Sequence, residues 1–225
     1  MFIVTGASKG LGNAICARLI KSNKQVFGLA RDTSKLQFES IDCDVSSALE
    51  VRSVAKIIRK KKFNVEGIIN AAGIASMNLA LTTPSSTTEK IIKTNLLGTI
   101  YCCQQFAPFL LRNKKGIIIN FSTIAVSLGL KGESIYAASK AGVEGFSRAF
   151  AREMADFNIP VNCIAPGPIK TDLIRGVSEN QINKIISNQI FQKQFTPDDV
   201  CDLVEMLIED SAQTLSGQVF HVGGA

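Results

Sequence analysis

The fold is decided by one stretch of the chain, FIVTGASKGLG at residues 2–12. A continuous apolar run ends there in three glycines, Gly6, Gly10 and Gly12, which come directly before a helical pattern. Glycine lets the backbone turn tightly and approach a ligand closely, and the free N–H groups at a helix start attract phosphate. We therefore predict a diphosphate-binding turn between a strand and a helix, with an ordinary strand–helix turn as the alternative. The residues expected at the ligand are Gly6, Ser8, Lys9, Gly10, Leu11 and Gly12.

Strand-like and helix-like segments alternate along the whole chain. Apolar runs lie at residues 2–4, 26–30, 38–41, 67–70, 116–121, 161–165 and 218–222, and helical spacing lies at 11–22, 47–61, 87–111, 136–157 and 197–208. Runs that are apolar throughout are typical of strands buried on both faces of a parallel sheet. We therefore predict a single α/β domain over residues 1–225, with a doubly wound, mostly parallel seven-stranded sheet and helices on both faces.

Composition excludes several classes of function. The 225 residues are 46% hydrophobic but contain no apolar stretch long enough to span a membrane. The cysteines form no C-x-x-C pair and the only histidine is His221, so we expect reduced cysteines, no metal site and no serine–histidine hydrolysis. The first residues form no basic leader, which favours a cytoplasmic location.

The net charge of +6 would attract an anionic partner or cofactor. Its densest runs lie at residues 59–62 and 114–115, where helices are expected to end. Cations at a helix C-terminus complement the helix dipole, so a solvated helix end is the simpler interpretation of both runs. No aromatic residues interleave with them, and we therefore expect no nucleic-acid partner.

The choice of cofactor is expected at the end of the second strand. An acid there would bind the ribose hydroxyls of NAD, whereas a cation would bind the additional phosphate of NADP. The chain has Arg31 at this point, and Lys9 in the glycine turn can converge on the same phosphate. NADP(H) is therefore favoured, while Asp32 leaves NAD(H) possible.

A reaction centre is indicated by YAASK at residues 136–140. Tyr136 and Lys140 are one helical turn apart and share a helix face. An ammonium beside a phenol favours the phenolate and lowers its pKa. Such a pair can exchange a proton with an alcohol or carbonyl oxygen while a nicotinamide exchanges hydride with the adjoining carbon.

These residues together resemble the short-chain dehydrogenase/reductase family. The resemblance covers nearly the whole chain and rests on TGASKGLG at 5–12, CDV at 43–45, NAAG at 70–73, Asn95, YAASK at 136–140 and PGPIKT at 166–171. It implies a Rossmann fold, a nicotinamide cofactor and a homotetramer, with a dimer possible. The cofactor-binding residues that it adds are Asp44 and Val45 at the adenine, Asn70, Ala71, Ala72 and Gly73 along the channel, Lys140 at the ribose, Ile169 and Thr171 at the carboxamide, and in addition Tyr136, Pro166 and Gly167. It also implies that Asn95 shapes a helix break and a water relay behind Lys140.

Two positions depart from the family pattern. Ala71 stands where the family usually has a second asparagine, and Thr123 stands where it has its catalytic serine. A threonine hydroxyl can donate the same hydrogen bond, although its β-branched side chain is more restricted. Thr123 is therefore the expected carbonyl-polarising donor and Ser122 the second candidate, unless both hydroxyls only bind nearby backbone groups.

The substrate is indicated more weakly than the chemistry. The apolar segment 172–196 resembles the lid of the family and would suit an acyl chain, although a small helix pair packed on the body is an equally good interpretation. The segments 167–175 and 216–224 resemble 3-oxoacyl-[acyl-carrier-protein] reductases, and Arg175 and Lys114 match positions that contact the acidic carrier protein. The leading hypothesis is thus an NADPH-dependent reductase of a 3-oxoacyl thioester. The alternatives are a dehydrogenase of another small ketone, sugar or cyclic alcohol, and a non-catalytic cofactor-binding regulator.

Overall fold

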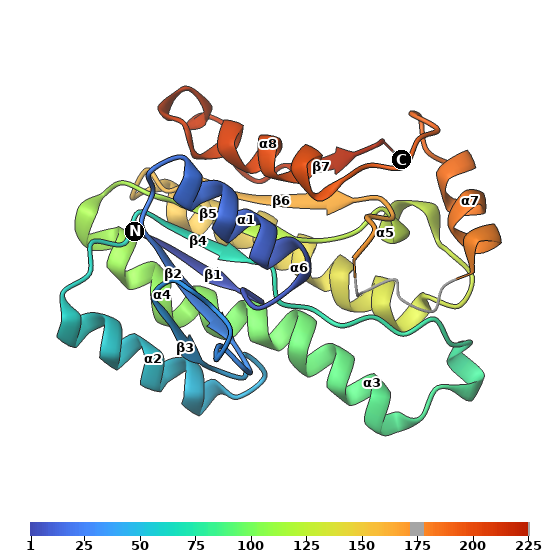
Figure 1. The fold of residues 1–225 in the computed structure, drawn as a ribbon, viewed down its shortest axis with the longest axis horizontal. Helices are drawn as coiled ribbons and strands as arrows, with labels where there is room; N and C mark the ends of the chain where they lie inside the picture. Colours follow the sequence, from blue (N-terminus) through green and yellow to red (C-terminus); the bar gives the residue numbers. More distant parts are fainter. Residues whose placement is uncertain (172–177, 225) are drawn as a thin grey trace.

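The sheet of the computed structural model, which describes residues 1–171 and 178–224, has seven strands, and every neighbouring pair runs parallel. The strand order is β3-β2-β1-β4-β5-β6-β7. The strands are β1 (Phe2–Thr5), β2 (Val26–Ala30), β3 (Ser40–Asp42), β4 (Gly67–Asn70), β5 (Ile117–Phe121), β6 (Val161–Pro166) and β7 (Val219–Val222). The chain winds outward from β1 in both directions, so the crevice beside β1 at the carboxyl ends of the strands is the natural ligand site of the fold. Figure 1 shows the strand arrows pointing toward the side of the molecule that carries α5 (Ala125–Leu128) and α7 (Glu179–Ser187).

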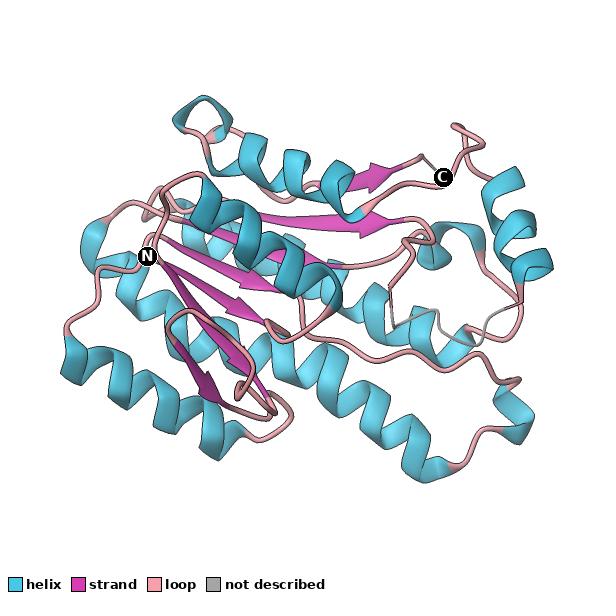
Figure 2. Ribbon diagram, viewed as in Figure 1, coloured by secondary structure: helices cyan, strands magenta, loops and turns pink. Residues whose placement is uncertain are grey.

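Helices cover both faces of the sheet, as the continuous apolar runs predict (Figure 2). One hydrophobic core lies under α1 (Gly10–Lys21) and α8 (Pro197–Ile208), and it includes Val4 and Ile69 from the strands. The other core lies under α2 (Ala48–Lys61), α4 (Gly98–Asn113) and α6 (Ser134–Ala155), and it includes the strand neighbours Ile3 and Ile68. Successive strand residues therefore enter opposite cores, which confirms the predicted doubly wound α/β architecture.

The predicted helix at 87–111 is instead two helices joined by a π-helical turn. α3 (Ser85–Ile92) leads through the π turn Lys93–Leu97 directly into α4. Asn95 lies in this turn, where its side chain accepts a hydrogen bond from the Ile74 N–H at 2.9 Å and donates one to the Ile74 carbonyl at 2.9 Å. At the position of the expected helix break the structure has this π turn, and Asn95 joins the turn to the segment that follows β4.

The third strand lies two residues later in the sequence than its apolar pattern suggests. The predicted strand at 38–41 begins at Ser40, and Phe38 is not part of it. Its ring packs across β2 instead, and a Cβ at Gly28 would lie only 2.7 Å from the Phe38 ring. The aromatic signal therefore came from a contact between the loop and the sheet. No helix of the described residues is both long and apolar enough to cross a membrane.

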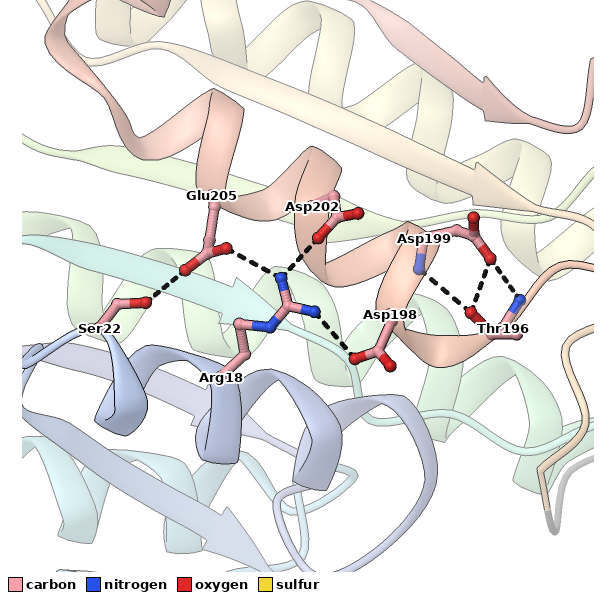
Figure 3. A network of polar contacts seen from close by, with 7 residues as sticks. All are labelled: Arg18, Ser22, Thr196, Asp198, Asp199, Asp202 and Glu205. Atoms are coloured by element: carbon pink, nitrogen blue, oxygen red, sulfur yellow. Dashed lines mark hydrogen bonds and ion pairs between the residues drawn. The ribbon is translucent and has the colours of Figure 1, made fainter.

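An ion-pair network holds α8 against α1 on one face of the molecule (Figure 3). The Arg18 guanidinium binds three carboxylates of α8, those of Asp198, Asp202 and Glu205. Glu205 also accepts a hydrogen bond from the Ser22 hydroxyl. α8 itself starts at a capping box between Thr196 and Asp199, which is drawn in the same figure. Polar contacts therefore add to the apolar contact between these two helices.

Of the expected lid at 172–196, residues 172–177 lie outside the described residues. The remainder contains α7, which begins at a capping box between Ser178 and Gln181. Its Ile185 faces the cleft described below, whereas Ile190 and Phe191 beyond the helix are exposed.

Candidate active site

A cleft of about 440 Å³ opens at the carboxyl ends of the strands. Of the site residues expected from the sequence, all but Asn70 and Asn95 line this one cleft. They are Gly6, Ser8, Lys9, Gly10, Leu11, Gly12, Arg31, Asp44, Val45, Ala71, Ala72, Gly73, Ser122, Thr123, Tyr136, Lys140, Pro166, Gly167, Ile169 and Thr171. Residues from distant parts of the sequence therefore meet in a space that is large enough for an extended ligand.

The glycine-rich turn forms the floor of the cleft at the start of α1. Gly6 has a φ of +70°, and a Cβ there would lie 2.9 Å from the Ala72 Cα. A Cβ at Gly12 would overlap the carbonyl oxygen of Gly6. The missing side chains leave the first N–H groups of α1 accessible from the cleft, which is the arrangement that binds a diphosphate. The residues present therefore fit a dinucleotide.

The end of β2 presents a cation to the cleft. Arg31 is exposed, lines the cleft and forms no ion pair with the described residues. The Asp32 carboxylate does not line the cleft, because it accepts hydrogen bonds from the Ser34 N–H at 3.0 Å and the Ser34 hydroxyl at 2.6 Å. These hydrogen bonds hold the pKa of Asp32 below its ordinary value. Asp32, the acid that leaves NAD(H) possible, is therefore hydrogen-bonded to Ser34 and does not face the cleft.

Asn70 and Asn95 lie behind the wall of the cleft. Asn70 is 2% exposed and donates to the Asn120 side chain at 2.8 Å. Asn95 is fully buried and donates to the Ser139 hydroxyl at 3.0 Å. A Cβ at Gly73 would lie 3.4 Å from both the Asn95 Oδ1 and the Lys140 Nζ, so both side chains approach this glycine closely.

Tyr136 and Lys140 are both buried on α6 and both line the cleft. The Lys140 Nζ donates a hydrogen bond to the Phe121 carbonyl at 2.8 Å, at the end of β5. Burial lowers the pKa of Lys140 to about 8. Burial also raises the pKa of the Tyr136 phenol, and the charge of Glu133 raises it further. The sequence predicts that the Lys140 amine lowers the pKa of the Tyr136 phenol. In the structure the amine donates to the Phe121 carbonyl instead, and burial raises the pKa of the phenol.

The two hydroxyls after β5 have different partners. Ser122 donates to the buried Glu144 Oε1 at 2.6 Å. The Thr123 hydroxyl lies close enough to the Tyr136 phenol to lower its pKa, which opposes the increase caused by burial. Thr123 also accepts a bond from the Ala125 N–H at 3.3 Å. The structure thus places Thr123, and not Ser122, beside the tyrosine.

Several cleft residues were not anticipated from the sequence. Glu133, Lys90 and Thr94 line the cleft, and Gln189 packs behind it against Gly167. Glu133 is three residues before Tyr136, and this helical spacing is a signal that could have identified it. Lys90 lies in α3 and Thr94 in the π turn, and neither residue has a sequence signal of its own.

One expected surface is contradicted by the topology. Lys114 follows the last turn of α4 and precedes β5, so it lies at the amino ends of the strands. The cleft lies at their carboxyl ends, and Lys114 therefore cannot form part of a basic rim around its mouth. Arg175, the second residue expected there, lies outside the described residues.

Strand order reverses beside the glycine-rich turn, and the tyrosine and lysine of α6 face the same crevice. This arrangement defines an oxidoreductase that uses a nicotinamide dinucleotide. A model of the family described as short chain dehydrogenase matches residues 1–182, and the chain belongs to the short-chain dehydrogenase/reductase family.

Curated relatives with similar sequences are reductases. The chain is 32% identical to the 3-oxoacyl-[acyl-carrier-protein] reductase FabG of Staphylococcus epidermidis, over 99% of this chain and 96% of that protein. It is 33% identical to carbonyl reductase family member 4 of Xenopus laevis, over 98% and 95% of the two chains.

Solved structures with the same fold include dehydrogenases. The aldohexose dehydrogenase of Thermoplasma acidophilum is 29% identical with a TM-score of 0.89, over 99% of this chain and 92% of that one. A 4-hydroxyisoleucine dehydrogenase mutant complexed with NADH and succinate is 26% identical with a TM-score of 0.92, over 99% and 97% of the two chains. The oxidoreductase class is therefore clear, while the relatives differ in substrate.

Proposed function

We propose that the protein is an NADPH-dependent carbonyl reductase that converts a 3-oxoacyl thioester to the 3-hydroxyacyl form. One observation carries this proposal. The Tyr136 and Thr123 hydroxyls lie close together in the same cleft that the glycine-rich turn lines. Similarity to the 3-oxoacyl-[acyl-carrier-protein] reductase supports the thioester as the substrate class.

Each residue of the site has a separate task in this reaction. Thr123 and Tyr136 donate hydrogen bonds to the substrate carbonyl, and Tyr136 transfers its proton to the oxygen as the adjoining carbon is reduced. Lys140 would hold the nicotinamide ribose, and the Phe121 carbonyl keeps its Nζ at the end of β5. Asn95 positions the Ile74 segment through two backbone hydrogen bonds. The nicotinamide, when bound, supplies the hydride.

The pKa of the phenol does not decide the direction of the reaction. Tyr136 must carry its proton before each reduction, and an ordinary phenol with a pKa of about 10 does so at neutral pH. Burial and the charge of Glu133 raise the pKa of Tyr136 further, which makes it a weaker acid.

The preference for NADPH is supported by the cations at one end of the cleft. Arg31 and Lys9 can share a phosphate, while Asp32 is bound to Ser34. Replacing Arg31→Ala should raise the KM for NADPH roughly tenfold or more and leave the KM for NADH nearly unchanged. Lys35→Ala is a matched control, because Lys35 is exposed nearby but does not line the cleft. An unmodified protein that works better with NADH would contradict this assignment.

A substrate panel tests the reaction itself. Acetoacetyl thioesters, simple ketones and an aldohexose are offered with each cofactor, and the absorbance of NADPH or NADH is followed. We expect the thioesters to give the highest kcat/KM. Activity on ketones or the sugar alone would overturn the thioester proposal and leave the oxidoreductase class intact.

Partner and location follow from the same proposal. Reduction of a carrier-bound thioester would bring an acyl carrier protein to the cleft in the cytoplasm, and the family resemblance favours a homotetramer. Light scattering would give the mass of the assembly, and a fluorescent acyl carrier protein would report binding by anisotropy.

A further inference from the structure

One acidic residue of the cleft has no task in the proposed reaction. Glu133 is the residue before α6, one turn ahead of Tyr136, and its backbone carbonyl accepts a bond from the Ala137 N–H at 2.7 Å. It is only 6% exposed, and its surface faces the cleft together with Ile124, Leu130 and Ile185. A largely buried acidic residue therefore lines the cleft one helical turn from Tyr136.

The Glu133 carboxyl group forms no ion pair within residues 1–171 and 178–224, and burial alone raises its pKa. The other charged residues that line the cleft are Lys9, Arg31, Asp44, Lys90 and Lys140. The last of these donates to the Phe121 carbonyl instead. A buried charge is screened less than one in water, so it acts more strongly on groups that enter the cleft.

Glu133 acts electrostatically on the reaction centre. Its negative charge is the second cause, after burial, of the raised pKa of the Tyr136 phenol. A charge that affects the phenol oxygen also affects a charged group that a substrate places beside the reacting carbonyl. Two negative charges in a weakly solvated pocket repel each other more strongly than they would in water.

We propose that Glu133 is a specificity-determining residue that rejects substrates with a negative charge next to the reacting carbonyl. The pocket then accepts a 3-oxoacyl group when it is a neutral thioester or ester and excludes the free 3-oxo acid, whose carboxylate would face Glu133. The thioester form of this statement rests on the proposed function, but the charge selection does not. Selection of this kind works by repelling the wrong ligand rather than by tighter binding of the right one.

The test compares a neutral compound with its anionic counterpart. Ethyl acetoacetate and acetoacetate present the same 3-oxo group with and without a charge. The kcat/KM for each is measured in the unmodified protein and in Glu133→Gln, which keeps the shape and removes the charge. We expect the preference for the ester over the acid to fall roughly tenfold or more in Glu133→Gln. Any common change in proton transfer from Tyr136 cancels in that ratio.

Two controls separate charge selection from general damage. Glu153→Gln makes the same change of net charge at an exposed position of α6 and should leave the ratio unchanged. Binding of the same two compounds to the protein–NADPH complex, followed by NADPH fluorescence, gives the ratio without turnover. A ratio equal in Glu133→Gln and the unmodified protein would overturn the proposal. Loss of thioester reduction with the ester preference intact would instead overturn only the proposed substrate.

Discussion

Arg18 and Lys140 are cations in opposite situations, and their difference separates the part of the molecule that is stabilised from the part that reacts. Arg18 lies at the surface between α1 and α8 and binds three carboxylates at once. Lys140 is 4% exposed, and among the described residues its hydrogen-bond acceptor is the Phe121 carbonyl oxygen alone. The network raises the pKa of the first cation, whereas burial lowers that of the second to about 8. The Arg18 guanidinium already binds three carboxylates, whereas the Lys140 ammonium can still donate hydrogen bonds to a ligand in the cleft.

The largest effect on kcat is expected at Tyr136, one helical turn before Lys140. Tyr136→Phe removes the transferable proton and little volume, so kcat should fall about 10²- to 10⁴-fold. NADPH binding, measured by fluorescence, should stay close to that of the unmodified protein. Turnover that survives this change would mean that another group supplies the proton.

The pair of hydroxyls after β5 sharpens the comparison within the buried region. Thr123→Val should lower kcat about 10- to 100-fold, because the donor beside Tyr136 is lost while the shape is kept. Ser122→Ala should leave most of the kcat but lower the free energy of unfolding by about 1–3 kcal/mol, because it leaves the buried Glu144 short of a donor. Steady-state kinetics and urea unfolding of both variants distinguish the roles. The reverse pattern would make Ser122 the catalytic hydroxyl.

The lowered pKa of Lys140 predicts a pH-dependent stability. The pKa is about 8 in the folded chain and 10.5 for an ordinary lysine. Between these values the unfolded chain binds a proton that the folded chain does not, so the folded state gains stability as pH rises. From about pH 7.5 to 9.5 the unfolding free energy of the unmodified protein should increase by about 2 kcal/mol relative to Lys140→Met, measured without cofactor. Parallel curves for the two proteins would show that the amine is not buried as described.

The smallest effect is expected at Arg18. Arg18→Gln should lower the Tm slightly, because exposed ion pairs contribute little, and should leave kcat unchanged. The difference in Tm should shrink in about 1 M salt, which screens surface charges. A large loss of activity would break the separation between the two regions.

Much of the fold could be predicted from short-range pattern alone. Ile68 and Ile69 are apolar neighbours because each faces a different helix layer, so a continuous apolar run identifies a strand at the centre of the sheet. Phe38 misled the same reasoning, since its ring packs on Gly28 from a loop. An apolar pattern indicates that a residue is buried, but it does not show whether the residue belongs to the strand or packs on the sheet from a loop.

The site was predictable to the extent that its chemistry depends on backbone geometry. Gly6 and Gly12 are required by contacts that no other residue allows, so their spacing indicates the ligand directly. The roles of Ser122 and Thr123 depend on Glu144 and Tyr136, which lie on another element and are brought close only by packing. Glu133 was missed because a single acid in a turn is an ordinary surface residue until the cleft around it is known.

The π turn at Lys93–Leu97 has a consequence for how such a gene can change. Each residue advances a helix by about 100° of rotation, so loss of a single codon here would restore a regular helix while turning α3 away from its present face. Lys90 and Thr94 would then leave the cleft, and the Asn95 amide would lose the Ile74 backbone. Selection should therefore remove single-codon insertions and deletions at Lys93–Leu97, although it tolerates them in surface loops.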